Sequence, residues 1–351
     1  MTQPKSTLIT LQNDKCSLSI DLFGGAIIDF RLNQNIINPL SFSFSKQQMP
    51  LNNQSGANYQ GHFLCLGRWG LPSSGEIKAG IPNHGQFANI LWTAKNQQED
   101  LVQMDTVAAL EGLAIERKIL LDKNNPVWAV KEVVKNINSI GRLYSMVQHP
   151  TLGAPFLDGS VIIDCNASKG FDQALYKDVE NNTFHWPIIK DSHLSDFHFN
   201  HSTTFDNAVY SFIVDPESEY GWISAYSPNH QLLFGYIWKR KHYSWIHLWQ
   251  HWDGNQIKYR GLEFGNTGIH QPFKEILATA TNLFGEDTFD YIDAGETVSR
   301  NYFSFLCPVE TDFVGVENIQ IINDTIQIKS KVKDTEIIFK LTSELFHELS
   351  K

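Results

Sequence analysis

The sequence has no long hydrophobic run, few cysteines and little positive charge. Its 351 residues include no apolar stretch of about 20 residues, the length that a membrane-spanning helix requires. The first residues also lack an apolar segment long enough for a signal peptide. The four cysteines, Cys16, Cys65, Cys165 and Cys307, form no C-x-x-C pair, which favours reduced, structural thiols. We therefore expect a cytoplasmic protein without a membrane partner.

The charge balance argues against nucleic acid as a partner. The chain carries 28 Lys and Arg residues against 38 Asp and Glu residues, for a formal net charge of -10. Binding to a phosphate backbone needs a basic face. The one dense basic run, Lys239-Arg240-Lys241, is too short to supply such a face and is better interpreted as a solvated loop.

Motifs of the common cofactor and nucleophile sites are missing as well. The chain has no G-x-G-x-x-G loop and no G-x-S-x-G turn. The stretch "SHLSDFHFNH" gathers His193, His198 and His201 with Asp191 and Asp196, but this spacing matches no common zinc motif. A polar loop is the better interpretation. We expect neither a metal nor a cofactor.

What the sequence does contain is many short strand patterns. Runs such as "AIIDFRL", "SVIIDC" and "QLLFGYIW" are bounded by turn residues, and aromatic residues, which favour strands, make up 12% of the chain. This pattern predicts an all-β sandwich or barrel with few short helices. We expect one domain over residues 1–308. Residues 309–351 are expected to form an extension of strands and a short terminal helix packed on that domain.

One carboxylate stands out in the stretch "YRGLEFGNTG". Strand alternation turns Glu263 away from Leu262 and Phe264, which we expect to face the core. Gly261 and Gly265 lie on the same face as Glu263 and leave room beside it. The alternative is an ordinary solvated strand carboxylate.

Two histidines and a tryptophan are further candidates. His84 in "NHGQF" and His149 in "QHPTLG" lie in rigid backbone where strands should end, which suits the fixing of an imidazole. Each alone could be structural, but with Glu263 they form an acid/base set. In "WIHLWQHWDG", Trp249 shares a strand face with His247 and His251, as either a sugar-stacking wall or core packing.

Taken together, these motifs resemble the aldose 1-epimerase (galactose mutarotase-like) family. "LFGGAIIDFRL", "GRWG" with "PNHG", "QHPTLG", "RGLEFGNTG" and "DAGETVSRNYFSF" follow the order of the family's motifs over about residues 18 to 306. The resemblance implies a large β-sandwich, a supersandwich with an open, curved sheet that forms a sugar cleft. It also implies interconversion of the α and β anomers of a hexose or related sugar by general acid/base ring opening, without a cofactor.

The resemblance assigns a role to each matching residue. Glu263 takes the position of the general base and His149 that of the general acid. His84 and Arg68 take sugar-hydroxyl-binding positions, and Asp206 in "TTFDNAVYSF" is the best match to the family's sugar-binding aspartate. Trp249 is expected to contact the sugar. The expected partner is a small-molecule carbohydrate, and the protein is expected to be a monomer or a homodimer.

Two departures from the family pattern keep other functions open. Between Arg68 and His84 the chain has "WGLPSSGEIKAGIP" in place of the stretch rich in arginine and asparagine, and the tail after Cys307 has no counterpart in the minimal enzyme. The alternatives are a carbohydrate-binding protein without catalysis and a hexose-phosphate 1-epimerase.

Overall fold

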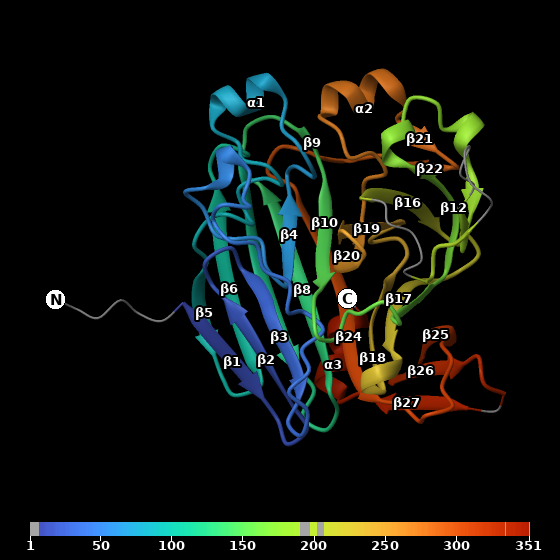
Figure 1. Cartoon of the computed structure of the whole chain (residues 1–351). Helices are drawn as coiled ribbons and strands as arrows, with labels where there is room; N and C mark the ends of the chain where they lie inside the picture. The colour runs from blue at the N-terminus through green and yellow to red at the C-terminus, as the bar shows by residue number, and fades with distance from the viewer. Residues whose placement is uncertain (1–6, 190–196, 202–206, 334, 351) are drawn as a thin grey trace.

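Two large antiparallel sheets make up most of the molecule (Figure 1). The computed structural model describes residues 7–189, 197–201, 207–333 and 335–350. In spatial order, the twelve-stranded sheet contains β1 (Leu8–Gln12), β2 (Cys16–Asp21), β3 (Ala26–Leu32), β4 (His62–Leu66), β10 (Met146–Leu152), β20 (Gln256–Gly265), β19 (Trp245–Asp253), β16 (Ala208–Val214), β12 (Ala167–Asp172), β13 (Phe184–His185), β14 (Ile188–Ile189) and β15 (Phe197–His198).

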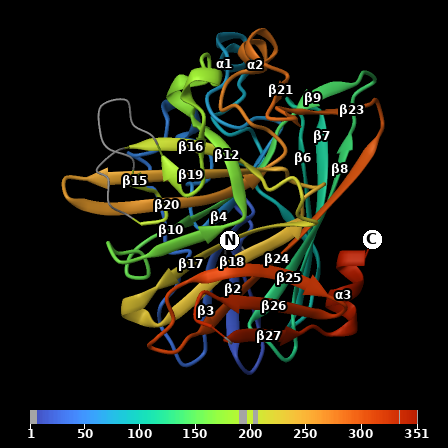
Figure 2. The ribbon, with the colours of Figure 1, turned by 90° about the vertical axis from the view of Figure 1, so that its right-hand side faces the viewer.

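The second sheet has eight strands. Its order is β11 (Ile162–Cys165), β17 (Tyr220–Ser227), β18 (Leu232–Lys239), β24 (Thr297–Pro308), β8 (Val127–Asn136), β7 (Leu113–Leu121), β6 (Leu101–Ala108) and β5 (Thr93–Gln97). Two small ladders join β21 (Asn282–Leu283) to β22 (Glu286–Asp287) and β9 (Arg142–Tyr144) to β23 (Asp290–Ile292). The short helices α1 (Ser74–Ala79) and α2 (Phe273–Thr279) lie together at one end of the sandwich (Figures 1 and 2).

The main core lies between the two sheets. Leu262 and Phe264 of β20 share one buried hydrophobic cluster with Val130 of β8 and Phe234 of β18. The ring of Phe264 stacks on Trp238 of the second sheet, with ring centroids 4.2 Å apart. The predicted all-β sandwich is therefore confirmed.

A buried polar network also ties the sheets together. Arg117 of β7 and Glu132 of β8 form an ion pair at 2.6 Å, and both side chains are almost completely buried. Gln148 of β10 donates a hydrogen bond to Oε2 of Glu132 at 2.6 Å, and its Oε1 lies 3.0 Å from Nε2 of His62 on β4. These contacts hold β4 and β10 from the core side, directly behind the face that carries the candidate site.

The C-terminal residues cover the outer face of the eight-stranded sheet (Figure 2). The strands β25 (Val316–Ile322), β26 (Thr325–Ser330) and β27 (Glu336–Lys340) form a small sheet, followed by α3 (Ser343–Ser350). Ile326 and Ile328 share a second hydrophobic cluster with Phe303 and Phe305 of β24. The two large sheets and this small sheet thus form three layers. No helix in the described part of the chain has the length and apolarity needed to cross a membrane.

All four cysteines are buried, and none of them forms a disulfide.

Candidate active site

Glu263 and His149 lie in one row of residues across the middle of the twelve-stranded sheet. Phe63 of β4 pairs with His149 of β10, Glu263 of β20 pairs with His247 of β19, and His247 pairs with Ser211 of β16. The pairs Gln148–Phe264 and Thr151–Gly261 bracket His149 and Glu263, so these two residues also stand opposite each other. Residues in register on adjacent strands point to the same face, which brings two segments over a hundred residues apart in sequence into contact.

The local sequence of β20 explains how Glu263 faces a pocket. Leu262 and Phe264 lie in the core between the sheets, while Glu263 lines the pocket on the opposite face. A Cβ atom added to Gly261 would lie 3.0 Å from Oε1 of Glu263 and 3.1 Å from Cβ of Trp249. Glycine at this position therefore leaves the carboxyl group room.

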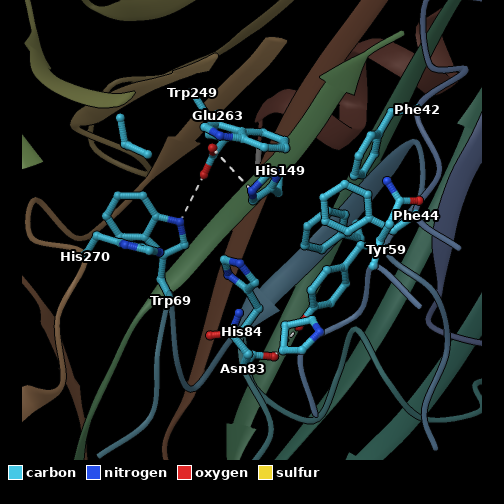
Figure 3. Close-up of a pocket in the computed structure, with 14 residues that line it drawn as sticks. Phe42, Phe44, Tyr59, Trp69, Asn83, His84, His149, Trp249, Glu263 and His270 are labelled. Carbon is cyan, nitrogen blue, oxygen red and sulfur yellow. Dashed lines mark hydrogen bonds and ion pairs between the residues drawn. The ribbon is translucent and has the colours of Figure 1, made fainter. Parts of the chain in front are cut away.

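The pocket itself has a volume of about 170 Å³ and is walled largely by aromatic rings (Figure 3). Such a cavity holds a small molecule, since a single water needs only about 10–15 Å³ on this measure. Its lining residues are Phe42, Phe44, Gln48, Pro50, Tyr59, Phe63, Trp69, Asn83, His84, His149, Val209, Trp249, Glu263 and His270. Aromatic walls with a few convergent polar groups are typical of a small-molecule site.

Glu263 and His149 form a close pair in this pocket (Figure 3). Oε1 of Glu263 lies 3.3 Å from Nε2 of His149. The other carboxyl oxygen, Oε2, accepts a hydrogen bond of 2.9 Å from the indole N–H of Trp69. On its far side, Nδ1 of His149 lies 3.0 Å from Oγ1 of Thr151, and the imidazole stacks on the ring of Phe63. Both polar ends of the pair are thus held in place.

Burial shifts the acidity of both groups towards their uncharged forms. It raises the pKa of Glu263 to about 8, although the Trp69 hydrogen bond acts in the opposite direction. It lowers the pKa of His149 below the ordinary value. Desolvation disfavours whichever form is charged, so burial favours a carboxylic acid beside a neutral imidazole. Oε1 of Glu263 and Nε2 of His149 are the atoms through which the two groups approach each other.

His84 is a third imidazole in the pocket. Its Nδ1 accepts a hydrogen bond of 3.2 Å from the N–H of Gly70 and lies 3.2 Å from Sγ of Cys65. Burial lowers the pKa of His84, so the ring is neutral and carries its hydrogen on Nε2. The backbone of His84 has a φ of 59°, in the left-handed region that is uncommon for residues other than glycine. Such a conformation persists only where the surrounding loop stabilises it.

Arg68 is not among the residues that line the pocket, and its expected contact with a sugar stays a prediction. Its guanidinium donates to Oε1 of Glu76 at 2.6 Å and to the carbonyl of Gln271 at 2.9 Å, and it lies over the ring of Phe273. Glu76 belongs to α1, inside the stretch that departs from the family pattern. Its other oxygen closes a capping box with Ser73. The local helix therefore supplies Arg68 with a counter-ion and holds it behind the pocket wall.

The other predicted residues divide into two groups. Trp249 lines the pocket, with its ring centroid 6.1 Å from that of His149. Asp206 lies outside the described residues, as do His193, Asp191 and Asp196. In the described part of the chain, no group of three or more His, Cys, Asp or Glu side chains is placed to hold a metal ion.

Sequence reasoning missed Trp69 and His270. Trp69 directly follows Arg68 in "GRWG", and nothing in this motif marks its indole N–H as a partner for a carboxylate 194 residues away. His270 lines the pocket, and burial, together with the charge of Arg68, lowers its pKa to about 4. The signal for His270 was available, because "GIHQPF" places a histidine close to glycine and proline, as for His84 and His149.

The two large antiparallel sheets form a β-sandwich with the galactose mutarotase-like fold, as the comparison with solved structures shows. The chain matches no protein-family model and no curated protein sequence. Solved structures are similar to it. A galactose mutarotase related enzyme from Lactobacillus acidophilus has a TM-score of 0.60 at 11% identity, over 86% of this chain and 99% of that chain.

Two further structures agree with this likeness. A galactose mutarotase-like protein from Lactobacillus casei has a TM-score of 0.58 at 10% identity, over 86% of this chain and 100% of that chain. A protein from Klebsiella pneumoniae with the provisional description of an aldose 1-epimerase has a TM-score of 0.60 at 12% identity, over 87% of this chain and 80% of that chain. At these identities the comparisons show the shared fold.

Proposed function

We propose that the protein is an aldose 1-epimerase acting on an uncharged hexose or a related free sugar. The observation that carries this proposal is the 3.3 Å contact between Glu263 and His149 inside an aromatic pocket. The anomeric hydroxyl oxygen and the ring oxygen of a cyclic sugar are attached to the same carbon. Two proton-transfer groups this close to each other can therefore serve both oxygens of one bound sugar.

The ring-opening step needs one proton acceptor and one proton donor. With the mobile proton on His149, the carboxylate of Glu263 takes the hydrogen of the anomeric hydroxyl. The O–H electron pair forms the C1 carbonyl as the C1–O5 bond breaks, and Nε2 of His149 protonates the ring oxygen. After rotation about C1–C2 the same steps run in reverse on the other face. Each positioned proton transfer accelerates such a reaction by about 10²–10⁴-fold.

The pocket wall favours an uncharged substrate. Among the described residues that line it there is no lysine or arginine. The nearby guanidinium of Arg68 is already bound by Glu76. A phosphate group would lose its hydration without gaining a partner charge, which is costly. The apolar faces of a sugar ring can instead rest on rings such as Trp249 and Tyr59.

Polarimetry of freshly dissolved α-sugars, over a panel of hexoses and pentoses, tests the proposal. The wild-type protein should accelerate mutarotation, and Glu263→Gln should lower kcat by about 10²-fold or more because the proton acceptor is lost. Exposed Glu99→Gln serves as the control for the same chemical change.

Full activity in Glu263→Gln would contradict the assignment of the base. Competition by a hexose 6-phosphate as strong as that by the free sugar would favour a hexose-phosphate epimerase.

A carbohydrate-binding protein without catalysis is the second candidate. One observation favours it, namely the capture of Arg68 by Glu76, which engages a residue expected to contact the sugar. Calorimetry with the same sugars separates the two functions. Binding that Trp249→Ala weakens, with no acceleration of mutarotation by the wild-type protein, would establish the binding function instead.

A further inference from the structure

The Glu263–His149 pair is held at both ends, by Trp69 and by Thr151. Oε2 of Glu263 is bound by the indole N–H of Trp69, and Nδ1 of His149 faces the hydroxyl of Thr151. We propose that Trp69 and Thr151 are positioning residues that confine the mobile proton to the gap between Oε1 and Nε2. This inference rests on the proposed function, because it assigns the atoms that exchange the proton with the sugar.

Trp69 decides which carboxyl oxygen can take a proton. An indole N–H is only a donor, and the carbonyl oxygen of a carboxylic acid accepts a hydrogen bond more strongly than its hydroxyl oxygen does. The hydrogen bond is 2.9 Å long, and both side chains are nearly completely buried. The proton of the acid form therefore resides on Oε1, the oxygen that faces His149. Phenylalanine at position 69 would keep an aromatic ring but remove the indole N–H, so that either carboxyl oxygen of Glu263 could be protonated.

Thr151 decides which nitrogen of His149 exchanges the proton. Thr151 lies two residues after His149 on β10, so both side chains project from the same face, and it is fully buried. When Oε1 donates to Nε2, the neutral imidazole must carry its own hydrogen on Nδ1. The hydroxyl of Thr151 accepts that hydrogen at 3.0 Å. Nε2 is then the nitrogen that gains and loses the mobile proton, and Nδ1 stays protonated throughout.

Other titratable groups surround the pair. His84 and His270 line the same pocket, and His247 and Cys65 come from the neighbouring strands β19 and β4. His62 lies on the core face of β4. Because these groups lie around the pair on both faces of the sheet, a pH profile must be compared with that of variants that leave the surroundings intact.

The test for Trp69 uses Trp69→Phe with Trp238→Phe as its control. Trp238 is also a buried tryptophan whose indole N–H makes a hydrogen bond, here to the carbonyl of Tyr243 at 2.7 Å.

The pH titration of Glu263 is followed without sugar, by NMR of a ¹³C-labelled carboxyl. Loss of a hydrogen bond that favours the carboxylate should move the titration of Glu263 to higher pH in Trp69→Phe and leave it in place in Trp238→Phe. The alkaline limb of kcat/KM should move in the same direction. Equal titrations in the two variants would overturn the role of Trp69.

The test for Thr151 compares Thr151→Val, Thr151→Ser and Thr267→Val. Thr267 is a matched control because it is buried and its hydroxyl binds the carbonyl of Thr288 at 2.6 Å. In Thr151→Val, the ¹⁵N shifts of His149 should show a loss of the Nδ1–H tautomer, and kcat should fall by about tenfold or more. Serine should restore both, because it keeps the hydroxyl.

Two outcomes would overturn the role of Thr151. One is a serine variant as slow as the valine variant, and the other is an unchanged tautomer in Thr151→Val. The two NMR measurements need no substrate. A protein that shows the expected NMR changes but does not accelerate mutarotation would therefore refute the proposed function alone.

Discussion

Glu263 combines a buried position with a titratable group, and this combination makes the stability of the protein depend on pH. Its side chain is almost completely buried, and burial raises its pKa to about 8 in the folded protein. In the unfolded chain the carboxyl group is solvated and has its ordinary pKa of about 4.5. The folded state therefore binds the proton more tightly than the unfolded state does, and stability that is present at low pH is lost as the pH rises towards 8.

This linkage predicts how Glu263→Gln changes stability. The free energy of unfolding of the wild type should fall, relative to that of the variant, by up to about 1.4 kcal/mol per pH unit between pH 4.5 and about 8. Equilibrium denaturation of both proteins at a series of pH values measures the difference. Because every other group is shared, the difference isolates Glu263. A difference that does not change with pH would show that Glu263 is not protonated in the folded protein.

At the scale of elements, α1 shows how one local segment redirects a charged residue. Ser73 and Glu76 form a capping box that starts the helix, and Gly80 ends it in the left-handed conformation. The same Glu76 neutralises the buried Arg68. The sequence "SSGE" carries the capping signal, but the direction in which Glu76 reaches depends on where β4 places Arg68.

Glu76→Ala is therefore expected to destabilise the protein. It removes half of the capping box and leaves the guanidinium of Arg68 with one carbonyl partner, a loss of about 1–3 kcal/mol. Chemical denaturation would measure this loss, with Lys78→Ala in the same helix as the control. If the variant also bound a hexose 6-phosphate, the released Arg68 would have reached the pocket. A stability equal to that of the wild type would show that the ion pair contributes nothing.

At the scale of the whole molecule, the C-terminal sheet shields an apolar face of the eight-stranded sheet. Ile328 of β26 is fully buried against that sheet, whereas Ile338 of β27 remains 57% exposed. The alternation that makes β26 amphipathic can be read from "TIQIKS", because Ile326 and Ile328 are two residues apart. Which surface they cover is decided by the tertiary structure.

Ile328→Asp should detach or unfold this layer, because it buries an unpaired carboxylate. We expect aggregation of the variant in light scattering, since the face formed by Phe303 and Phe305 would become exposed. Ile338→Asp makes the same chemical change at an exposed position and should stay monodisperse like the wild type. Similar behaviour of the two variants would contradict the shielding role.

The strand-rich fold and the face of β20 to which the side chain of Glu263 points could both be predicted from the sequence, because both depend on the local alternation of apolar and polar residues. Leu262 and Phe264 required a core on one side of β20, and Glu263 followed on the other. Which side chains contact Glu263 depends on the tertiary structure. The contacts of Trp69 with Glu263 and of His149 with Glu263 join distant segments, and their distances depend on strand order and register. The contacts of Arg68 could not be predicted from the sequence for the same reason. Its two acceptors, Oε1 of Glu76 and the carbonyl of Gln271, are brought to it by the packing of α1 and of the segment that contains Gln271.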